Sequence, residues 1–425
     1  MSTPRPSRPG TEPPRGMRDI LPEEAELRDR TAQTILDVYR KHGFRRIETP
    51  ALEHIQLLTG GEGGENEKLI FKVLKRGERL DLAGAASEAD LVDLGLRFDL
   101  TVPLARYYAN NHAKLPRPLK AVQIGPVWRA ERPQKGRFRQ FTQCDIDILG
   151  VTSEVAEIEL ILATTEALTT LGFEDLTVRI NDRRILTAMA AWCGFDPARH
   201  DSVFIALDKW DKLEAPAIAS ELAREGHPGP AIDRMIRVFT ELRDEGELEP
   251  LRAYVEDAEA QRAVHGLKRI MEAARSEAPV RFDATLVRGM SYYTGPIFEI
   301  VSARFPSSIA GGGRYDRLIG KILGQEVPAT GFSIGFERVI LILAERTGAA
   351  ARGRRRVALL FDEATPDLKP VLERARQLRE HEELLVSLEF RARRRGPQLA
   401  ALETQGFDGF VEGPDGPLQW FGEKR

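Results

Sequence analysis

Near the N-terminus, four apolar residues stand at positions i, i+3, i+4 and i+7 of one run: Ala32, Ile35, Leu36 and Tyr39. This spacing is that of the buried stripe of an amphipathic helix. Gly43 follows at the point where a helix commonly ends in a left-handed residue. A strand is predicted next, over residues 44–49, and Pro50 ends it.

A pair of strands joined by an arginine-rich turn is predicted between residues 122 and 148. The first, over residues 122–131, is rich in β-prone residues. In the second, three apolar residues alternate with three polar ones: Cys144, Ile146 and Ile148 with Gln143, Asp145 and Asp147. A period of two is typical of a half-buried strand with one apolar and one polar face. Arg129 and Glu131 stand two residues apart and therefore point to the same side, where the polar face of the second strand can meet them.

Helical periodicity resumes after this strand pair. Residues 154–171 are predicted to form an amphipathic helix, and residues 195–280 carry helical spacing with charged faces. A basic linker at residues 346–356 precedes strands that alternate with helices between residues 357 and 411. This β-α-β-α-β order predicts a small separate α/β domain with parallel strand pairing.

The composition is that of a globular protein. With 425 residues, of which 42% are hydrophobic, the chain can bury a large core and is expected to divide into two or three domains. The formal net charge of -3 excludes a basic field over the whole molecule, so a nucleic-acid partner must be met by local clusters. Residues 1–15 are rich in proline and arginine and lack an apolar segment, which predicts a disordered tail and not a signal peptide. No apolar run is long enough to cross a bilayer, so no membrane association is expected.

Cysteine and histidine usage gives no sign of a disulfide framework or a zinc site. Cys144 and Cys193 are the only cysteines and lie far apart, which favours a reducing, cytoplasmic environment. The seven histidines are scattered without the pair spacings of a metal site. No metal ligand is therefore expected among the side chains.

The arginine-rich turn and its strands are the first place where the pattern points to chemistry. A planar guanidinium such as that of Arg129, held on a rigid strand, suits bidentate contact with a phosphate. A fixed positive charge at a phosphorus under attack also stabilises the charge that develops there. A solvated basic hairpin would contain the same residue types, so the motifs elsewhere in the chain decide between the two.

Segment 127–143 resembles motif 2 of class II aminoacyl-tRNA synthetases, in the form found in histidyl-tRNA synthetases. Further segments resemble other parts of that family and occur in the same order. Residues 16–22 resemble its N-terminal segment, and the run of helix, Gly43, strand and Pro50 resembles motif 1. Residues 96–103 and 286–295 resemble two histidine-binding segments, and residues 331–339 resemble motif 3. The glycine run 311–313, shortly before motif 3, lets the backbone approach a ligand closely. The resemblance covers most of the chain and fades after Gly353.

The resemblance implies an α+β fold, with an antiparallel class II synthetase sheet of six to seven strands flanked by helices, in a homodimer. The catalytic domain would span residues 16–345 with a helical insertion at 195–280, and residues 357–425 would form a reduced anticodon-binding-like α/β domain. The implied activity is that of a histidine–tRNA ligase, with ATP as substrate and Mg2+ as cofactor. L-histidine would be activated to histidyl-adenylate and then transferred to the 3' end of tRNA(His).

Matching positions imply roles for individual residues. The catalytic residues would be Arg129 and Arg288. The histidine-binding residues would be Asp99, Leu100, Thr101, Arg129, Gln143, Asp147, Arg288, Tyr292 and Tyr293. The ATP-binding residues would be Arg129, Glu131, Arg137, Phe141 and Arg338. The tRNA-binding residues would be Gln134, Lys135, Arg139, Arg393 and Arg394. Two positions depart from the family pattern: Ser291 replaces a commonly acidic residue, and Asp147 stands where many bacterial members carry glutamate.

Two alternatives stay open. One is a catalytically inactive regulatory paralogue of the ATP phosphoribosyltransferase complex in histidine biosynthesis, a class that lacks the anticodon domain and typically loses motif 2 and motif 3 arginines. This chain keeps Arg129, Arg288 and Arg338. The other is a paralogous enzyme that activates histidine for a purpose other than decoding.

Overall fold

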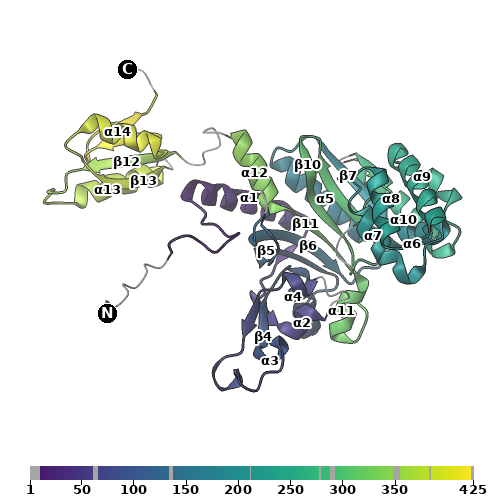
Figure 1. Ribbon diagram of the computed structural model, residues 1–425. Coiled ribbons are helices and arrows are strands. Elements are labelled where there is room, and N and C mark those ends of the chain that lie inside the picture. The colour runs from purple at the N-terminus through teal and green to yellow at the C-terminus, as the bar shows by residue number, and fades with distance from the viewer. Residues whose placement is uncertain are drawn as a thin grey trace. The chain divides into compact units, whose positions relative to one another are not determined.

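The computed structural model describes residues 10–60, 66–133, 137–210, 212–276, 279–287, 292–347, 355–381 and 384–422. The chain divides into two compact units, Met1–Ala344 and Glu345–Arg425 (Figure 1). Of the predicted disordered tail, residues 1–9 lie outside the described residues, and residues 10–15 form no helix or strand. Of the predicted basic linker, residues 348–354 also lie outside them.

A mixed, largely antiparallel sheet of eight strands forms the centre of the first unit, in the order β1-β5-β6-β11-β10-β9-β7-β8. Its strands are β1 (Arg45–Arg46), β5 (Leu119–Trp128), β6 (Gln140–Leu149), β7 (Leu176–Asp182), β8 (Val280–Phe282), β9 (Pro296–Ser302), β10 (Phe305–Arg314) and β11 (Ala329–Ile334). The two short edge strands run parallel to their neighbours, and the inner pairs are antiparallel. The class of fold implied by the sequence is confirmed.

Strand β1 is much shorter than the strand predicted over residues 44–49. Backbone pairing with β5 continues as far as Ile47, whose N–H donates to the Val122 carbonyl at 3.0 Å. The Thr49 carbonyl instead accepts Nη1 of Arg97 at 2.6 Å. The ladder therefore stops because a buried arginine, and not the neighbouring strand, satisfies this part of the backbone.

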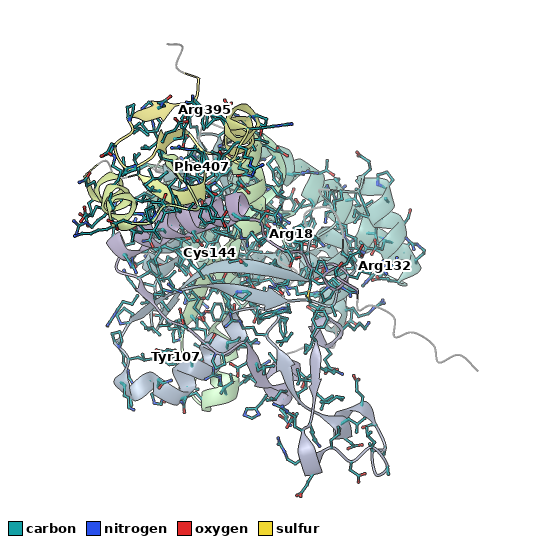
Figure 2. The ribbon with its side chains drawn as sticks, turned by 90° about the vertical axis from the view of Figure 1, so that its left-hand side faces the viewer. Arg18, Tyr107, Arg132, Cys144, Arg395 and Phe407 are labelled. Atoms are coloured by element: carbon teal, nitrogen blue, oxygen red, sulfur yellow. The ribbon has the colours of Figure 1, made fainter. Side chains whose placement is uncertain are left out.

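Helices α1 (Pro22–Lys41), α5 (Val155–Thr170) and α12 (Phe336–Thr347) pack with the sheet around the main core. The predicted stripe of α1 is confirmed, since Ile35, Leu36 and Tyr39 are buried. Gly43 ends this helix at φ 83°, the left-handed conformation expected there. On β6 the apolar residues face the same core, including Cys144 (Figure 2). Since one face of β6 is committed to this core, its polar residues must face the other side of the sheet.

A smaller three-stranded sheet, in the order β2-β4-β3, supports one side of the site. Its strands and the helices near it are β2 (Leu52–His54), β3 (Lys72–Leu74), β4 (Val92–Leu96), α2 (Ile55–Thr59), α3 (Glu88–Leu91), α4 (Thr101–Asn111) and α11 (Asp316–Leu323). Strand β4 leads through residues 97–100 directly into α4. This connection places Asp99 just before α4 and Thr101 at its first residue.

The α-helices between β7 and β8 form a layer of their own at one end of the sheet (Figure 1). They are α6 (Arg183–Cys193), α7 (His200–Leu207), α8 (Ala215–Arg224), α9 (Gly229–Glu245) and α10 (Ala258–Ala274). The helical character predicted for residues 195–280 is confirmed, but helix formation starts earlier, at Arg183. Short 3-10 helices occur at Asn66–Leu69, Gly77–Arg79, His112–Lys114, Pro197–Arg199 and Glu249–Ala253.

The second unit is a four-stranded sheet, in the order β13-β12-β14-β15, with two helices. Its elements are β12 (Arg356–Phe361), α13 (Lys369–His381), β13 (Leu385–Phe390), α14 (Arg395–Thr404), β14 (Gly409–Glu412) and β15 (Leu418–Trp420). Strands β13, β12 and β14 pair in parallel, as the alternating order predicted. One core contains residues of α13, and a second contains Leu402 of α14 together with Phe407 (Figure 2).

Candidate active site

The polar face of the central sheet carries a cavity of about 400 Å³. Strands β6, β10 and β11 form its floor, and the segment before α4 and the start of α12 complete its walls. Its lining includes Asp99, Thr101, Arg129, Glu131, Arg137, Phe141, Gln143, Asp145, Asp147, Tyr292, Tyr293, Ser308, Tyr315, Gly331, Ser333, Glu337 and Arg338. A volume of this size is typical of a site for small-molecule substrates.

Three buried aspartates gather at one end of the cavity, here called the acidic end: Asp99, Asp145 and Asp147, which are 2%, 4% and 3% exposed. Asp145 and Asp147 lie on one face of β6, opposite Ser333 and Gly331 of β11. A side chain at Gly331 would put its Cβ 2.0 Å from Oδ1 of Asp147. Only glycine therefore leaves room for this carboxylate.

The acidic end is only partly satisfied by the protein. Asp147 Oδ1 accepts the hydroxyl of Tyr315 at 2.5 Å. Asp99 Oδ1 accepts the Val102 N–H at 3.1 Å, whereas Asp99 Oδ2 is buried without a partner among the described residues. Since a buried carboxylate oxygen normally has a hydrogen-bond donor, this atom marks a place for a ligand donor.

Burial raises the pKa of all three aspartates. Desolvation raises the pKa of Asp99 to about 6, although the Val102 N–H and Arg129 act in the opposite direction. Desolvation also raises the pKa of Asp147 to about 7, against the hydrogen bond from Tyr315. For Asp145, burial and the nearby Asp147 raise the pKa well above its usual value. A cationic ligand would relieve this unfavourable accumulation of negative charge.

Tyrosine rings form a wall beside the acidic end. The ring centroids of Tyr292 and Tyr293 are 4.9 Å apart, and those of Tyr292 and Tyr315 are 5.9 Å apart. Their apolar bodies and polar tips suit a ligand that is itself aromatic and bears N–H groups.

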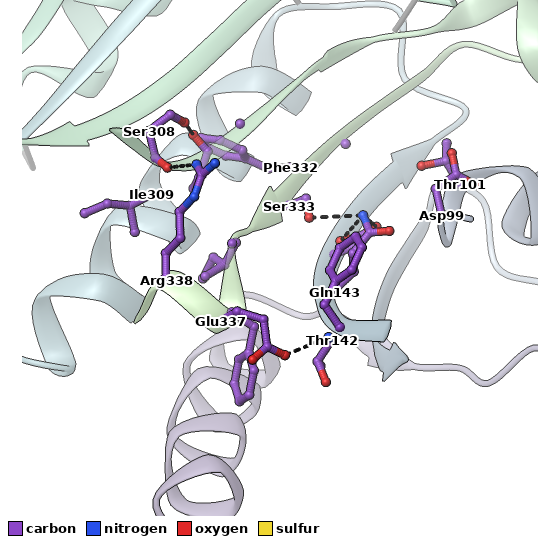
Figure 3. Close-up of a pocket in the computed structure, with 18 of the residues that line it drawn as sticks. Asp99, Thr101, Thr142, Gln143, Ser308, Ile309, Phe332, Ser333, Glu337 and Arg338 are labelled. Atoms are coloured by element: carbon purple, nitrogen blue, oxygen red, sulfur yellow. Dashed lines mark hydrogen bonds between the residues drawn. The ribbon is translucent and has the colours of Figure 1, made fainter. Parts of the chain in front are cut away.

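Arginines line the rest of the cavity, here called the basic end: Arg129, Arg137 and Arg338. Arg129 lies nearest the acidic end, since its charge acts to lower the pKa of both Asp99 and Asp145. Arg129 is fixed on two sides, because its Nε donates to the Phe98 carbonyl at 3.0 Å and its guanidinium lies 5.0 Å from the centroid of the Phe141 ring. Arg338 donates to the Ser308 carbonyl. Figure 3 shows Arg338 and Ser308 on one side of the cavity, Asp99 and Thr101 on the other, and Gln143 and Ser333 between them.

Glu337 in the wall of the cavity is a structural carboxylate. It accepts two N–H groups of Arg28, each at 2.7 Å, and the backbone N–H of Thr142 at 3.0 Å. Burial alone would raise the pKa of Glu337, but these hydrogen bonds lower it below its usual value. This charge-assisted network joins α1, β6 and α12 and keeps α12 in place.

Eleven of the residues expected from the sequence line this one cavity: Asp99, Thr101, Arg129, Glu131, Arg137, Phe141, Gln143, Asp147, Tyr292, Tyr293 and Arg338. Leu100 does not; it is buried, and its carbonyl accepts Nε2 of Gln123 at 3.2 Å. A buried apolar side chain at this position serves the core and not the cavity. Arg288, expected to be catalytic, lies outside the described residues.

The residues expected to contact tRNA come from both compact units. Gln134 and Lys135 fall outside the described residues. Arg139 does not line the cavity. Its Nε donates to the Glu131 carbonyl at 3.0 Å and its backbone N–H donates to the Gly16 carbonyl at 2.7 Å. Arg393 and Arg394 are exposed just before α14 in the second unit.

Sequence reasoning left several residues of the cavity out of its list of site residues: Asp145, Ser308, Tyr315, Gly331, Ser333 and Glu337. The signal for Asp145 was present, because it alternates with Gln143 and Asp147 on one strand face. Tyr315 carried no local signal. It directly follows β10, and only the order β6-β11-β10 in the sheet brings it close to Asp147 on β6. Among the described residues, no cluster of three histidine, cysteine or acidic side chains could hold a metal ion.

Comparisons with known proteins agree with this geometry. The model of the histidyl-tRNA synthetase family matches residues 16–339. The chain is 47% identical over 370 residues to the histidine–tRNA ligase of Leifsonia xyli subsp. xyli (strain CTCB07), covering 83% of this chain and 84% of the relative. It is 41% identical over 434 residues to the probable histidine–tRNA ligase of Tropheryma whipplei (strain Twist), covering 96% of this chain and 97% of that relative.

A crystal structure of histidyl-tRNA synthetase from Nostoc sp. PCC 7120 has the same fold, with a TM-score of 0.76 at 27% identity, over 95% of this chain and 91% of that one. In the described part of the chain, no helix combines the length and the apolar character that a membrane span requires. The family model and the relatives agree over most of the sequence, so the chain belongs to the histidyl-tRNA synthetase family.

Proposed function

We propose that the protein is a histidine–tRNA ligase that activates L-histidine with ATP and transfers it to tRNA(His). The observation that carries this proposal is the cavity itself, which has an acidic, aromatic-walled end next to an arginine-rich end. The first suits an amino acid with an ammonium group and an imidazole, and the second suits a nucleoside triphosphate.

At the acidic end, Asp99 is proposed to hold the α-ammonium group, since its Oδ2 is buried and unpaired among the described residues. Gln143, Asp147 and the tyrosines Tyr292 and Tyr293 would surround the imidazole ring. A buried site that hydrogen-bonds both ring nitrogens rejects analogues that leave its polar groups unpaired, by about 10⁴-fold or more in favourable cases.

At the basic end, Arg129 is proposed to contact the α-phosphate, with Arg288 joining it, and Arg338 to contact the γ-phosphate. The histidine carboxylate attacks the α-phosphorus, a new P–O bond forms, and the bond to pyrophosphate breaks. Because Arg129 is already fixed by Phe98 and Phe141, it needs little reorganisation as charge develops. Catalysis then rests on positioning and electrostatics.

Mg2+ fits the basic end as an ion that arrives with the phosphates. Glu131 lines the cavity there and is half-buried, so it offers a carboxylate oxygen. A site with one carboxylate plus substrate phosphates is typical of Mg2+, whereas a dedicated protein cage is not. When bound, the ion would neutralise phosphate charge.

The remaining assignments concern tRNA and assembly. The turn after Arg132, including Gln134, Lys135 and Arg139, is proposed to meet the acceptor end of tRNA. The second unit is proposed to be a reduced anticodon-binding domain in which Arg393 and Arg394 meet phosphates, which carry little sequence information. A cytoplasmic homodimer is proposed from family membership.

Histidine-dependent ATP–pyrophosphate exchange, followed by charging of total tRNA, tests the function. A histidine–tRNA ligase shows both activities. Exchange without charging would indicate a histidine-activating paralogue, and loss of both would indicate a regulatory protein. The cavity argues against the regulatory alternative, because Arg129 and Arg338 both line it.

A further inference from the structure

The side-chain amide of Gln143 holds a polar atom that the protein leaves unpaired. Its Nε2 lies 3.3 Å and 3.5 Å from the two carboxylate oxygens of Asp145 and 3.5 Å from Oγ of Ser333. Its Oε1 is buried and has no partner among the described residues. Gln143 lies between the two ends of the cavity (Figure 3), so this oxygen is available to a ligand.

Asp145 contacts protein donors on the cavity floor. It is 4% exposed and stands two residues after Gln143 on the same face of β6. Ser333 lies directly opposite it on β11, and the Ser333 hydroxyl acts to lower the pKa of the carboxyl. Asp145 therefore holds neighbouring side chains in place. Asp99 differs, because one of its carboxylate oxygens has no partner among the described residues.

The carboxylate of Asp145 decides which way the Gln143 amide points. A side-chain amide can occupy one space in two orientations that exchange its oxygen and nitrogen. With Oε1 turned toward Asp145, two acceptors would face each other in a buried environment, where the cost of unpaired polar groups is high. The orientation with Nε2 toward Asp145 is therefore favoured, and it directs Oε1 to the cavity.

We propose that Asp145 is a positioning residue that fixes the Gln143 amide so that its carbonyl oxygen accepts an N–H group of the amino-acid substrate. This inference rests on the proposed function and deepens it. With Asp99, Gln143 and Asp147 all presenting oxygens, the acidic end selects a ligand that offers several N–H donors. An isosteric ligand with an acceptor at the same place would meet an unpaired oxygen.

The preference is strongest when Asp145 is ionised. Burial and Asp147 raise the pKa of Asp145, Asp99 adds to this effect, and Ser333 and Arg129 oppose it. Kinetic tests therefore belong on the alkaline side, at about pH 8, because a higher pH increases the ionised fraction of Asp145.

A double-mutant cycle tests the proposal: Gln143→Ala, Asp145→Ala and the double variant, with KM for histidine and for ATP measured by pyrophosphate exchange. Each single change is expected to raise the KM for histidine about tenfold, the effect of one lost hydrogen bond in a buried site, and to leave the KM for ATP within about twofold. The double variant should be no worse than Gln143→Ala alone, because Asp145 acts through Gln143. Asp145→Asn, whose amide oxygen can still accept Nε2, should restore the KM to within about threefold of wild type.

Additive effects in the cycle, or an unchanged KM for histidine in Asp145→Ala, would overturn the proposal. If Asp145→Ala does not fold, Asp145→Ser replaces it in the cycle. Asp175→Ala is the matched control. The Asp175 carboxylate accepts the Ser302 hydroxyl at a distance of 2.8 Å and does not line the cavity, so its loss should leave both KM values unchanged. A wild-type protein without histidine-dependent exchange would refute the proposed function instead, so the two failures are distinguishable.

Discussion

The acidic and basic ends of the cavity hold their charges in different ways. The aspartates of the acidic end are almost fully buried and lie on strand β6 or just before α4. Of the arginines of the basic end, Arg129 directly follows β5, Arg137 lies in the turn before β6 and Arg338 lies in the first turn of α12. The Arg137 side chain is 54% exposed. A buried charge costs desolvation free energy unless a ligand pairs with it, so a buried site discriminates between ligands. An exposed charge can bind a ligand at little desolvation cost.

This difference matches two kinds of substrate. A small amino acid must be distinguished from other amino acids of similar size, and a dry, prearranged set of acceptors does this through the penalty for unpaired groups. A triphosphate carries enough charge to be held by arginines that remain in contact with water. The ends should therefore respond to mutation in different kinetic constants.

The largest effect is expected at the basic end, from Arg129→Ala. Loss of a fixed cation at the α-phosphate should lower the single-turnover rate of adenylate formation by about 10²–10³-fold. Arg132→Ala is the matched control, since Arg132 is an exposed arginine of the same turn that does not line the cavity (Figure 2). A rate for Arg129→Ala close to that of wild type would remove Arg129 from the catalytic role.

At the acidic end, Asp147→Asn should change histidine binding and not ATP binding. Replacing a carboxylate that faces an N–H donor with an amide is expected to raise the KM for histidine about 10- to 100-fold, the cost of a charged hydrogen bond. The KM for ATP should stay within about twofold of wild type. An unchanged KM and turnover for histidine would mean that Asp147 is only a structural residue of the strand.

The buried charge at Asp147 should also appear in the pH dependence of stability. Its pKa of about 7 in the folded protein lies well above the value near 4 of an unfolded chain. As the pH rises from about 4 to about 7, the unfolded chain loses this proton before the folded protein does, so the free energy of unfolding falls. Asparagine carries no such proton, so Asp147→Asn should gain stability relative to wild type between pH 5 and pH 8.

Thermal unfolding at these two pH values measures this gain as a rise in Tm. Each kcal/mol of added stability is expected to raise the Tm by about 2–4 °C. The control is Asp175→Asn, since the pKa of Asp175 is lowered and it titrates below this range: burial acts to raise it, but hydrogen bonds from Ser302 and Arg304 outweigh that effect. Its difference from wild type should be the same at both pH values. A pH-independent difference for Asp147→Asn would show that Asp147 is ionised throughout.

The smallest effect is expected from removal of residues 355–425. Both ends of the cavity belong to the first compact unit, so histidine-dependent pyrophosphate exchange should stay within about twofold of the full chain, as expected for separate domains. The KM for tRNA should rise. A soluble truncated protein without exchange activity would show that the second unit contributes to the site.

Local patterns in the sequence predicted the parts of the site that lie within single elements. The alternation on β6 placed Gln143 and Asp147 on the polar face. Asp99 and Thr101 were found through the resemblance of segment 96–103 to a histidine-binding segment of the family, and that segment leads into α4. The same patterns could not show that Tyr315 donates to Asp147, because these residues are 168 positions apart.

Long-range contacts also limited the prediction of the fold. The strand expected over residues 44–49 is short because Arg97, from another segment, takes the Thr49 carbonyl. Leu100 was expected in the site with its neighbours, but its side chain turns into the core. In each case the outcome depends on a partner that adjacent residues do not reveal.

A crystal structure of the protein with L-histidine and a non-hydrolysable ATP analogue tests the division of the cavity most directly. The account predicts the ammonium group at Asp99 Oδ2, the imidazole beside Asp147 and the tyrosines, and the phosphates at Arg129 and Arg338. An imidazole ring placed among the arginines, or phosphates beside the three aspartates, would contradict it.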